Sequence, residues 1–551
     1  MIFLISTFLF FGAYFLGRAL TIIYFYFFSK KKNFNELERN NLFLKFTYPI
    51  ISMFFIGNFL IFLNFFFNLQ DLTDYLFIVL FGLIFINFFS LPTKKFIFKY
   101  FLTVLPINLI LTISTYGQTV HYDATVYKLQ YQAWLKESKI VFGHTNFRDL
   151  FGYTGIMEYI SSSVWINEDL IIVHLLSVTI FTVFYGFIVS YSLQTKSTFL
   201  FFSSLFILFY SFLDNFGVEG GANGFLKFQM TGTYDLIFGI LFFFANIIIF
   251  QNIIESSYSK VNYFLVSLLL LFSFQVRIFA VASFGLFFFY SYSYLNKTKS
   301  DLKSILKINI PLFLVFGIYI LRNFIISGCL ILPVNLTCIN SVYWVSDISS
   351  LAERGLEYYV SYPLGSNVFI WASNWFSNPK NNQIFTNFLL SIFIILIFSK
   401  LFFEIKKDKS KILFSVVNIL FMWFIFFITG PTPRFGMGIF LISIFTISSF
   451  INDFKYNFKT NNIKKYILIF SFLVIGATPR LYSYKELIDS NFQTYTIAIP
   501  KYQFENSQLG WGLFPLIEGD FEKCGAVYNC LPNREIRIPF SYGSYIIFKN
   551  S

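Results

Sequence analysis

An acidic side chain, Asp123, stands where a hydrophobic stretch ends and an amphipathic segment begins. In that segment, Val126, Leu129, Ala133 and Trp134 recur at the spacing of one helix face. We expect a helix lying along the membrane surface with Asp123 near its start, where the carboxylate would face the lipid headgroups and the phosphate of a lipid-linked substrate. The alternative is that Asp123 only caps this helix, a common use of aspartate.

Several cationic side chains could bind a phosphate group beside this carboxylate. Arginine suits phosphate because its planar guanidinium donates two hydrogen bonds at once. Arg434 lies in a proline-bracketed turn, where its alternative role is an anchor among lipid headgroups. Arg277 interrupts an apolar stretch, so it marks a functional site or forms a structural pair with Asp235. Near the end of another apolar stretch, Arg322 is expected to be an anchor. Further candidates in the first polar loop are Lys128, Arg148 and His144.

The composition shows which elements must position these residues. Of 551 residues, 56% are hydrophobic, 84 are Phe and only 13% are charged. Such a chain lacks the charged residues to cover a soluble protein of its size, and its apolar content excludes disorder. The sequence therefore predicts an all-α polytopic membrane protein.

About fourteen stretches are apolar enough for spanning helices, a number uncertain by about two. The pair around Gln275 and Arg277 is either two half-length helices or one long helix. We expect a membrane bundle over 1–478 with long loops at 116–167 and 327–384, and a small mixed region over 479–551. The stretches are 2–28, 46–68, 75–92, 100–115, 169–193, 198–213, 231–253, 262–274, 278–294, 309–326, 385–402, 412–429, 435–451 and 466–478.

The net charge of +13 is explained by topology. Alternate loops between the predicted helices hold 23 basic residues against seven acidic ones, which places those loops in the cytoplasm. The first stretch lacks a basic leader and is read as a retained helix, so both termini are expected outside. A nucleic-acid partner is not expected.

The outer segments hold the four cysteines and the predicted strands. Cys329 with Cys338 and Cys524 with Cys530 could each form a local disulfide in an oxidising compartment. Short alternating runs over 494–499, 536–540 and 544–548 predict strands in the tail.

Three motifs resemble a poorly characterised bacterial family of multi-spanning proteins placed near the GT-C-type glycosyltransferases. Their order along the chain and their position outside the membrane both agree with that family. One position departs from it, because Lys128 stands where the family often has His. The motif residues are Tyr122, Asp123, Tyr127, Lys128, Gln130, Trp134, Val141, Gly143, Asn146, Arg148 and Gly152; then Arg322, Asn323, Ser327, Gly328, Pro333 and Trp344; and then Gly430, Pro433, Arg434, Phe435 and Gly438.

The resemblance implies a GT-C-like bundle of about 12–14 helices in the bacterial inner membrane. Its activity would be transfer of a sugar from a polyprenyl-phosphate donor to a cell-envelope acceptor on the periplasmic face. Asp123 would be the catalytic base. No cofactor and no metal site are predicted, although some GT-C enzymes use a divalent metal. The residues expected to contact the substrate or its phosphate are Arg434, Arg148, Lys128, Tyr127, His144 and Arg277.

Two other readings stay open at the level of sequence. An O-antigen-type polymerase or ligase would also use large outer loops and arginines on lipid-diphosphate substrates. A flippase or transporter for lipid-linked oligosaccharides would favour short loops on both faces, which the long segments 116–167 and 327–384 do not match. The cytoplasmic loops are too short for a nucleotide-binding domain, and no Walker A pattern is found.

Overall fold

A computed structural model describes most of the chain, and the statements below concern the described residues. Some positions inside the described helices and strands, among them Arg434, are described for their backbone alone. The described ranges are 1–29, 38, 41–71, 94–116, 118–165, 169–194, 198–214, 228, 230–255, 257–277, 282–332, 334–346, 368–405, 419–424, 433–448, 451–454, 481–489 and the strands between 508 and 548, with a few isolated positions.

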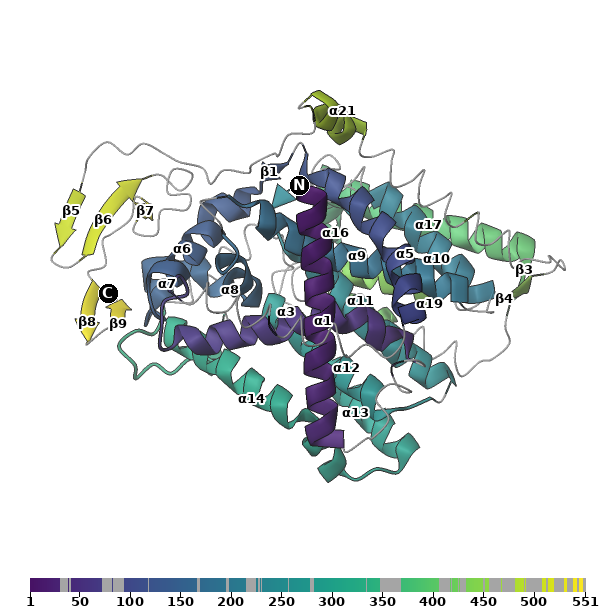
Figure 1. Cartoon of the computed structure of the whole chain (residues 1–551), viewed down its shortest axis with the longest axis horizontal. Coiled ribbons are helices and arrows are strands. Elements are labelled where there is room, and N and C mark those ends of the chain that lie inside the picture. Colours follow the sequence, from purple (N-terminus) through teal and green to yellow (C-terminus); the bar gives the residue numbers. More distant parts are fainter. Residues whose placement is uncertain are drawn as a thin grey trace.

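The molecule is an all-α bundle, as the hydrophobic stretches predict (Figure 1). Among the described residues, five helices are long and apolar enough to cross a membrane. They are α1 (Ile2–Ser29), α3 (Leu42–Asn64), α9 (Ile171–Gln194), α11 (Asp235–Glu255) and α14 (Leu302–Ser327). Shorter apolar helical stretches lie in α5 (Lys94–Thr112), α12 (Lys260–Val276), α17 (Pro379–Phe402) and α19 (Pro433–Ser448), and two further helices are α10 (Thr198–Asp214) and α13 (Ala282–Thr298).

Of the two alternatives left open around Gln275 and Arg277, the structure has the two separate helices. Helix α12 ends at Val276, and Arg277 has an extended backbone with φ −147°. Helix α13 begins at Ala282. The predicted spans over 75–92, 412–429 and 466–478 lie wholly or largely outside the described residues.

Close approaches between helices fix the bundle. A Cβ on Gly17 of α1 would lie 1.8 Å from the carbonyl oxygen of Tyr48 in α3, so only glycine fits there. The next residue, Arg18, forms a buried ion pair with Glu38 at 2.8 Å, and the Tyr48 hydroxyl donates to the same carboxylate. This partner satisfies the one arginine inside the first span, as burial of its charge requires.

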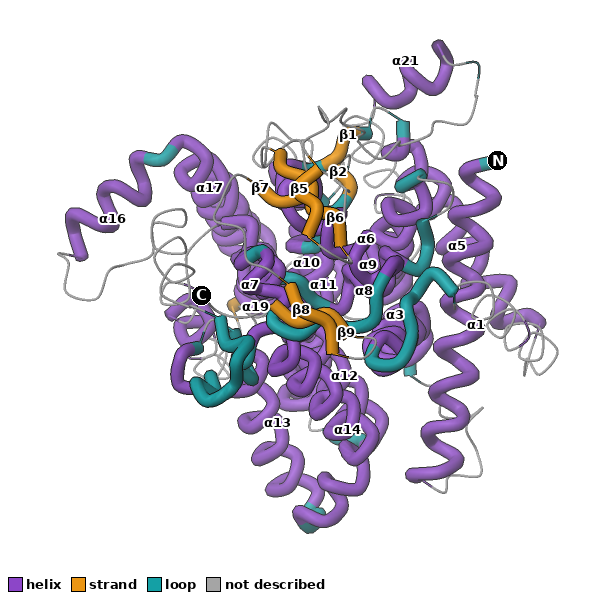
Figure 2. Tube along the Cα trace, turned by 90° about the vertical axis from the view of Figure 1, so that its left-hand side faces the viewer, coloured by secondary structure: helices purple, strands orange, loops and turns teal. Residues whose placement is uncertain are grey.

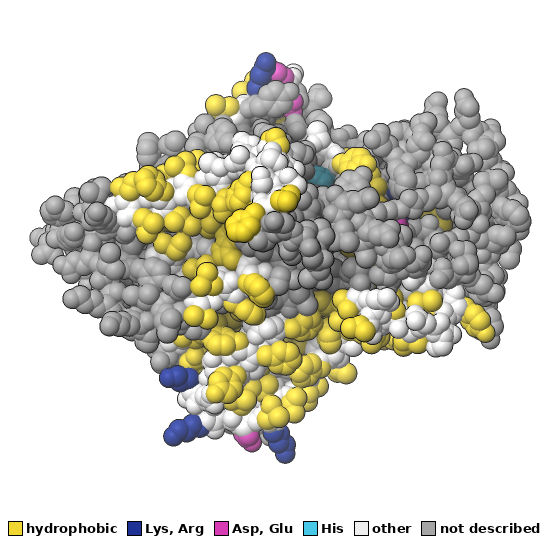
Figure 3. All heavy atoms as spheres, turned by 180° about the vertical axis from the view of Figure 1, so that it is seen from behind, with side chains coloured by type: hydrophobic (Ala, Val, Ile, Leu, Met, Phe, Trp, Pro, Cys, Tyr) yellow, Lys and Arg dark blue, Asp and Glu magenta, His cyan; other side chains and the backbone are white. Residues whose placement is uncertain are grey.

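The two ends of the bundle differ in chemistry. Figures 1 and 2 place the N-terminus, β1 and α21 at one end and the joined ends of α13 and α14 at the other. That second end carries the exposed Lys297, Lys299, Lys303 and Lys307. Figure 3 shows a broad hydrophobic face above this basic tip. The arrangement is that of a membrane protein with a basic end and an opposite end that holds the polar segments.

The first long polar segment is folded and mostly buried. It contains β1 (Thr119–Val120), a π-helix over Ala124–Lys128, α6 (Leu129–Glu137), α7 (His144–Phe147) and α8 (Ile156–Ser162). The expectation of a surface-lying amphipathic helix here is wrong, because every residue of α6 from Leu129 to Leu135 is buried. Its polar side is satisfied by protein partners: Gln130 accepts from Arg148, and Gln132 accepts from Trp165 at 2.9 Å.

The second long segment and the tail carry the remaining outer elements. Cys329 and Cys338 form the predicted disulfide after α14, whereas Cys524 lies outside the described residues. Residues 347–367 also lie outside them, and α16 (Val368–Ser377) follows. The tail is mixed, as predicted: it contains α21 (Leu481–Asp489), β5 (Gln508–Trp511), β6 (Phe514–Gly519), β7 (Cys530–Pro532), β8 (Pro539–Tyr542) and β9 (Tyr545–Phe548).

The predicted strand over 544–548 corresponds to β9, and the one over 536–540 overlaps β8. These two strands pair antiparallel, and β9 lies against α7. The strand predicted over 494–499 falls outside the described residues. The tail hairpin is therefore tied to the first polar segment of the bundle.

Candidate functional site

The π-helix at 124–128 brings Asp123 and Lys128 together. Its hydrogen bond from the Leu129 amide to the Ala124 carbonyl spans five residues, so side chains five apart come close to one line along the helix. In an α-helix they would point about 140° apart. The alternative of a helix cap is not supported, because the Asp123 side chain makes no capping hydrogen bond to this helix.

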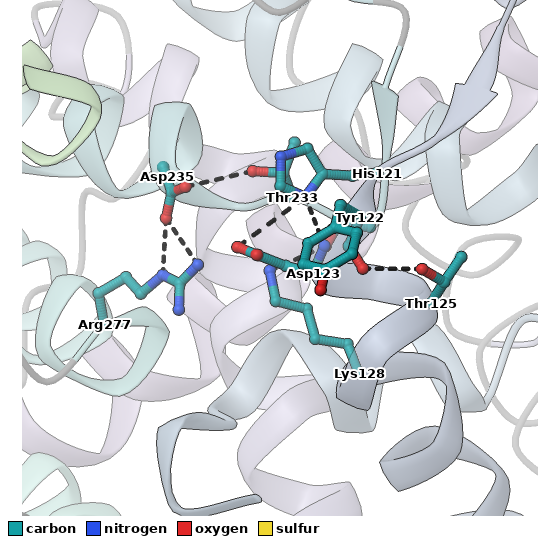
Figure 4. A network of polar contacts seen from close by, with 9 residues as sticks. His121, Tyr122, Asp123, Thr125, Lys128, Thr233, Asp235 and Arg277 are labelled. Atoms are coloured by element: carbon teal, nitrogen blue, oxygen red, sulfur yellow. Dashed lines mark hydrogen bonds and ion pairs between the residues drawn. The ribbon is translucent and has the colours of Figure 1, made fainter. Parts of the chain in front are cut away.

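Asp123 is the accessible acid of the site. Its side chain is 21% exposed, and one carboxylate oxygen lies 3.9 Å from Nδ1 of the buried His121. The same Nδ1 accepts a hydrogen bond from the Asp123 amide at 3.0 Å (Figure 4). His121 thus holds the Asp123 backbone, and the carboxylate stays partly exposed.

Lys128 holds a buried ammonium beside this carboxylate. Its Nζ donates to the Gly232 carbonyl at 2.9 Å and lies 5.0 Å from the centre of the Tyr234 ring. Burial, together with the charge of Arg277, lowers the pKa of Lys128 to about 8, against the opposing effect of Asp123, Asp235 and buried Glu158. The ammonium meets a neutral carbonyl, so its charge is available to an anionic ligand.

The acceptor of Lys128 belongs to a second polar segment that pairs with the first. Strand β2 (Met230–Thr231) runs parallel to β1, and the His121 amide donates to the Thr231 carbonyl at 3.0 Å. Gly232 follows with φ +86°, and a Cβ there would lie 2.4 Å from the Ala124 Cβ. Only glycine combines this backbone conformation with such a close approach to the π-helix.

Replacing Gly232 by alanine is expected to destabilise the protein by about 1–3 kcal/mol, because the new Cβ strains the backbone and displaces Ala124. The midpoint of thermal unfolding in detergent measures this. Gly317→Ala is the matched control, since a Cβ at Gly317 meets nothing within 4 Å. Equal midpoints for the two variants would contradict the expected strain at Gly232.

Arg277 forms the structural pair with Asp235 that the sequence left open. The guanidinium contacts one oxygen of Asp235 through Nε at 2.8 Å and through a terminal nitrogen at 2.6 Å. Thr233 donates to the other oxygen at 3.3 Å. The same arginine lies close enough to Tyr127 for the two side chains to interact electrostatically. In Figure 4, Lys128 and Asp123 lie between this pair and His121.

The proline-bracketed turn lies next to this pair. Arg434 occupies the first turn of α19, with its side chain outside the described part of the structure. Its neighbour Phe435 places its ring 5.7 Å from the Arg277 guanidinium carbon. One turn further along, a Cβ on Gly438 would lie 2.8 Å from the Gly239 carbonyl oxygen of α11. The N-terminal ends of α11 and α19 therefore meet beside Arg277.

His144 and Arg148 have different surroundings. His144 is 2% exposed and lies among the rings of Tyr131, Trp134 and Phe151. Burial and the charge of Arg322 hold the pKa of His144 well below its usual value, so it is neutral and suited to packing. The Arg148 guanidinium donates a hydrogen bond to the side chain of Gln130. It also lies close enough to Tyr127 for the two side chains to interact electrostatically.

Arg322 is not the surface anchor that the sequence favoured. Its side chain is 0% exposed. The guanidinium donates to Tyr131 at 2.7 Å, to the Thr154 hydroxyl at 2.7 Å and to the Asn323 amide oxygen at 2.9 Å. Trp344 of the same motif accepts a hydrogen bond at its carbonyl from Asn146 at 3.1 Å. The middle motif therefore joins α14 to the first polar segment and stabilises the fold around the site.

The sequence reading missed residues between Thr231 and Asp235. Gly232, Thr233 and Tyr234 each contact a site residue. The available signal was a Thr-Gly-Thr-Tyr-Asp run directly before an apolar span. Among the described residues no group of three or more His, Cys, Asp or Glu side chains could hold a metal ion.

The site combines one accessible carboxylate with two buried cations. Asp123 can accept a proton, while Lys128 and Arg277 can stabilise negative charge on a neighbouring group. The adjoining N-termini of α11 and α19 add positive potential from their unpaired amides. The arrangement suits a reaction in which an acceptor loses a proton while an anionic group leaves.

Comparisons with known proteins give one match. No curated protein and no solved structure matches the chain. Residues 1–441 match the model of a family described as a domain of unknown function, DUF8201. That range contains Asp123, Lys128, Arg277 and the turn at Pro433, and it ends before the tail. The chain therefore belongs to the DUF8201 family.

Proposed function

We propose that this protein is a membrane glycosyltransferase of GT-C type. It moves a sugar from a polyprenyl-phosphate donor to a glycan or lipid acceptor of the cell envelope, on the periplasmic face of the bacterial inner membrane. The observation that carries the proposal is the partly exposed carboxylate of Asp123 beside the buried Lys128 and Arg277. Strand β1, which precedes Asp123 in the chain, lies at the end of the bundle opposite the basic tip.

Each part of this site corresponds to one need of the reaction. Asp123 takes the proton of the acceptor hydroxyl as that oxygen attacks the anomeric carbon. The bond from the anomeric carbon to the phosphate oxygen breaks, and the phosphate leaves with the electron pair. Lys128 stabilises the negative charge that develops there, and Arg277 adds to the positive potential from its pair with Asp235. Arg434 stands at the same helix end and is the further candidate for contact with the phosphate.

Membranes that contain the protein test this proposal. Such membranes are supplied in turn with polyprenyl-phosphate glucose, mannose or galactose, each carrying a label in its sugar. The label is then followed into envelope glycans and lipids. We expect transfer from one of the three and release of polyprenyl phosphate. Movement of the intact labelled donor across proteoliposomes without release of polyprenyl phosphate would instead support a flippase.

The pH dependence of sugar transfer should report the ionisation of the Lys128 ammonium. Its pKa of about 8 means that the ammonium is charged below pH 8 and neutral above it. The value of kcat/KM for the donor should therefore fall as the pH rises through about 8, because this parameter reports the free enzyme. Lys128→Arg should move the fall to higher pH, since arginine stays protonated. Lys136→Arg, on the next helix, is the control and should leave the profile unchanged.

A further inference from the structure

A cavity of about 240 Å³ lies between α12, α13 and α14. Its walls are almost entirely apolar: α12 contributes Leu271 and Phe274, α13 contributes Phe284 and Phe288, and α14 contributes Phe313. Helices α13 and α14 are joined near Ser300 and diverge from that point (Figure 1). The cavity is the space between these diverging helices, and α12 forms its floor.

The cavity opens towards the surroundings of the bundle. Phe288 is 67% exposed and Phe313 is 45% exposed, and both line it. No described residue that lines it is charged, and the basic residues of this hairpin lie beyond its lower end. In a spanning protein such an opening faces hydrocarbon. Its natural occupant is therefore a hydrocarbon chain.

The cavity is elongated along the helices. On α12 its lining runs from Ser267 to Phe274, and on α14 it runs from Asn309 to Phe316. Seven residues of helix rise about 10 Å, roughly a third of the thickness of the hydrocarbon core. A chain lying in the cavity would run along these helices.

The upper end of the cavity lies close to the site. Phe274 lies in the last turn of α12, three residues before Arg277. Along the helix axis the two residues are therefore about 5 Å apart, less than one helical turn. Ser283, the second residue of α13, also lines the cavity, and its buried hydroxyl has no hydrogen-bond partner among the described residues. A chain in the cavity would thus present its head group to Ser283 and to the cations Arg277 and Lys128.

We propose that this cavity holds the first isoprene units of the lipid-phosphate substrate, with the phosphate at Arg277 and Lys128. The inference rests on the proposed function and adds to it the binding site of the lipid chain. The tails of other membrane lipids are as apolar as the cavity walls. The site must therefore select the isoprene chain by its shape and by the phosphate attached to it. The rings of Phe274 and Phe284, with centres 4.9 Å apart, provide a fixed wall for that selection.

Photocrosslinking measures occupancy of the cavity. The probe is undecaprenyl phosphate with a diazirine in the isoprene unit nearest the phosphate, added to the full chain in nanodiscs. We expect crosslinks on peptides of α12 and α13, and at least tenfold competition by unlabelled undecaprenyl phosphate. Equal labelling by a diazirine-bearing phosphatidylglycerol would overturn the proposal, because the cavity would then hold bulk lipid.

Two variants and a control separate the chain site from the catalytic site. Leu271→Trp fills the middle of the cavity and Ser283→Phe fills its upper end, so each should reduce crosslinking at least tenfold. Leu314→Trp on the exposed side of α14 should not. Crosslinks in the cavity without sugar transfer from any donor would support the lipid-chain site and refute the proposed glycosyltransferase activity. Transfer with crosslinks on other helices would refute only the chain site.

Discussion

Asp123→Asn should lower sugar transfer by about 10²- to 10⁴-fold, the usual contribution of a general base. Asparagine has nearly the same shape and cannot take a proton from the acceptor. The protein should stay folded, because the Asp123 side chain is partly exposed and does not cap the π-helix. We therefore expect a change in unfolding free energy within about 0.5 kcal/mol. Initial rates of transfer from the labelled donor, with the thermal midpoint of the same preparation, measure both effects.

Asp169→Asn is the matched control for that substitution. The Asp169 carboxylate accepts from the Ile171 amide at 2.9 Å at the start of α9, a bond that the asparagine oxygen can also make. Its transfer rate should equal that of the natural chain. If Asp123→Asn transfers sugar at the full rate while folded, Asp123 is not the base.

Breaking the pair of Arg277 and Asp235 should have the largest effect on stability. Arg277→Ala removes the cation that contacts the Asp235 carboxylate, whose residue is 2% exposed. Removing one partner of a buried pair costs about 3–5 kcal/mol. The thermal midpoint in detergent should fall accordingly, and transfer should be lost with it.

A double variant separates the structural role of the pair from its chemical role. Arg277→Met with Asp235→Leu removes both charges and fills the space, a change that is often neutral for a buried pair. We expect most of the lost stability to return and the transfer rate to stay low, because the positive potential at the phosphate is gone. A double variant that transfers at the natural rate would show that the pair serves the fold alone.

The hydrophobic pattern was sufficient to predict most of the bundle. The expected stretches 2–28, 169–193 and 262–274 agree within four residues with α1, α9 and α12. Length and polarity alone determine such elements, because a helix in hydrocarbon must satisfy its own backbone. The disulfide of Cys329 with Cys338 was readable for a similar reason, since it closes a short local loop.

The surroundings of each polar residue could not be read in the same way. Arg322 and Arg277 look alike in sequence, each at the end of an apolar stretch. The fold surrounds Arg322 with tyrosines and gives Arg277 a carboxylate partner 42 residues away. Similarly, α6 has the pattern of a surface helix, and only packing against α8 and the bundle buries its polar side.

By itself, the sequence determined that this protein is an all-α membrane bundle, where most of its helices begin and end, and that Asp123 stands at the start of the first polar segment. Only the tertiary structure decided what Asp123 faces. The π-helix turns Lys128 towards it, and the pairing of β1 with β2 brings Gly232 and Asp235 to the same place. The physical reason is that membrane spans follow from local hydrophobicity, whereas a site depends on contacts between segments about a hundred residues apart.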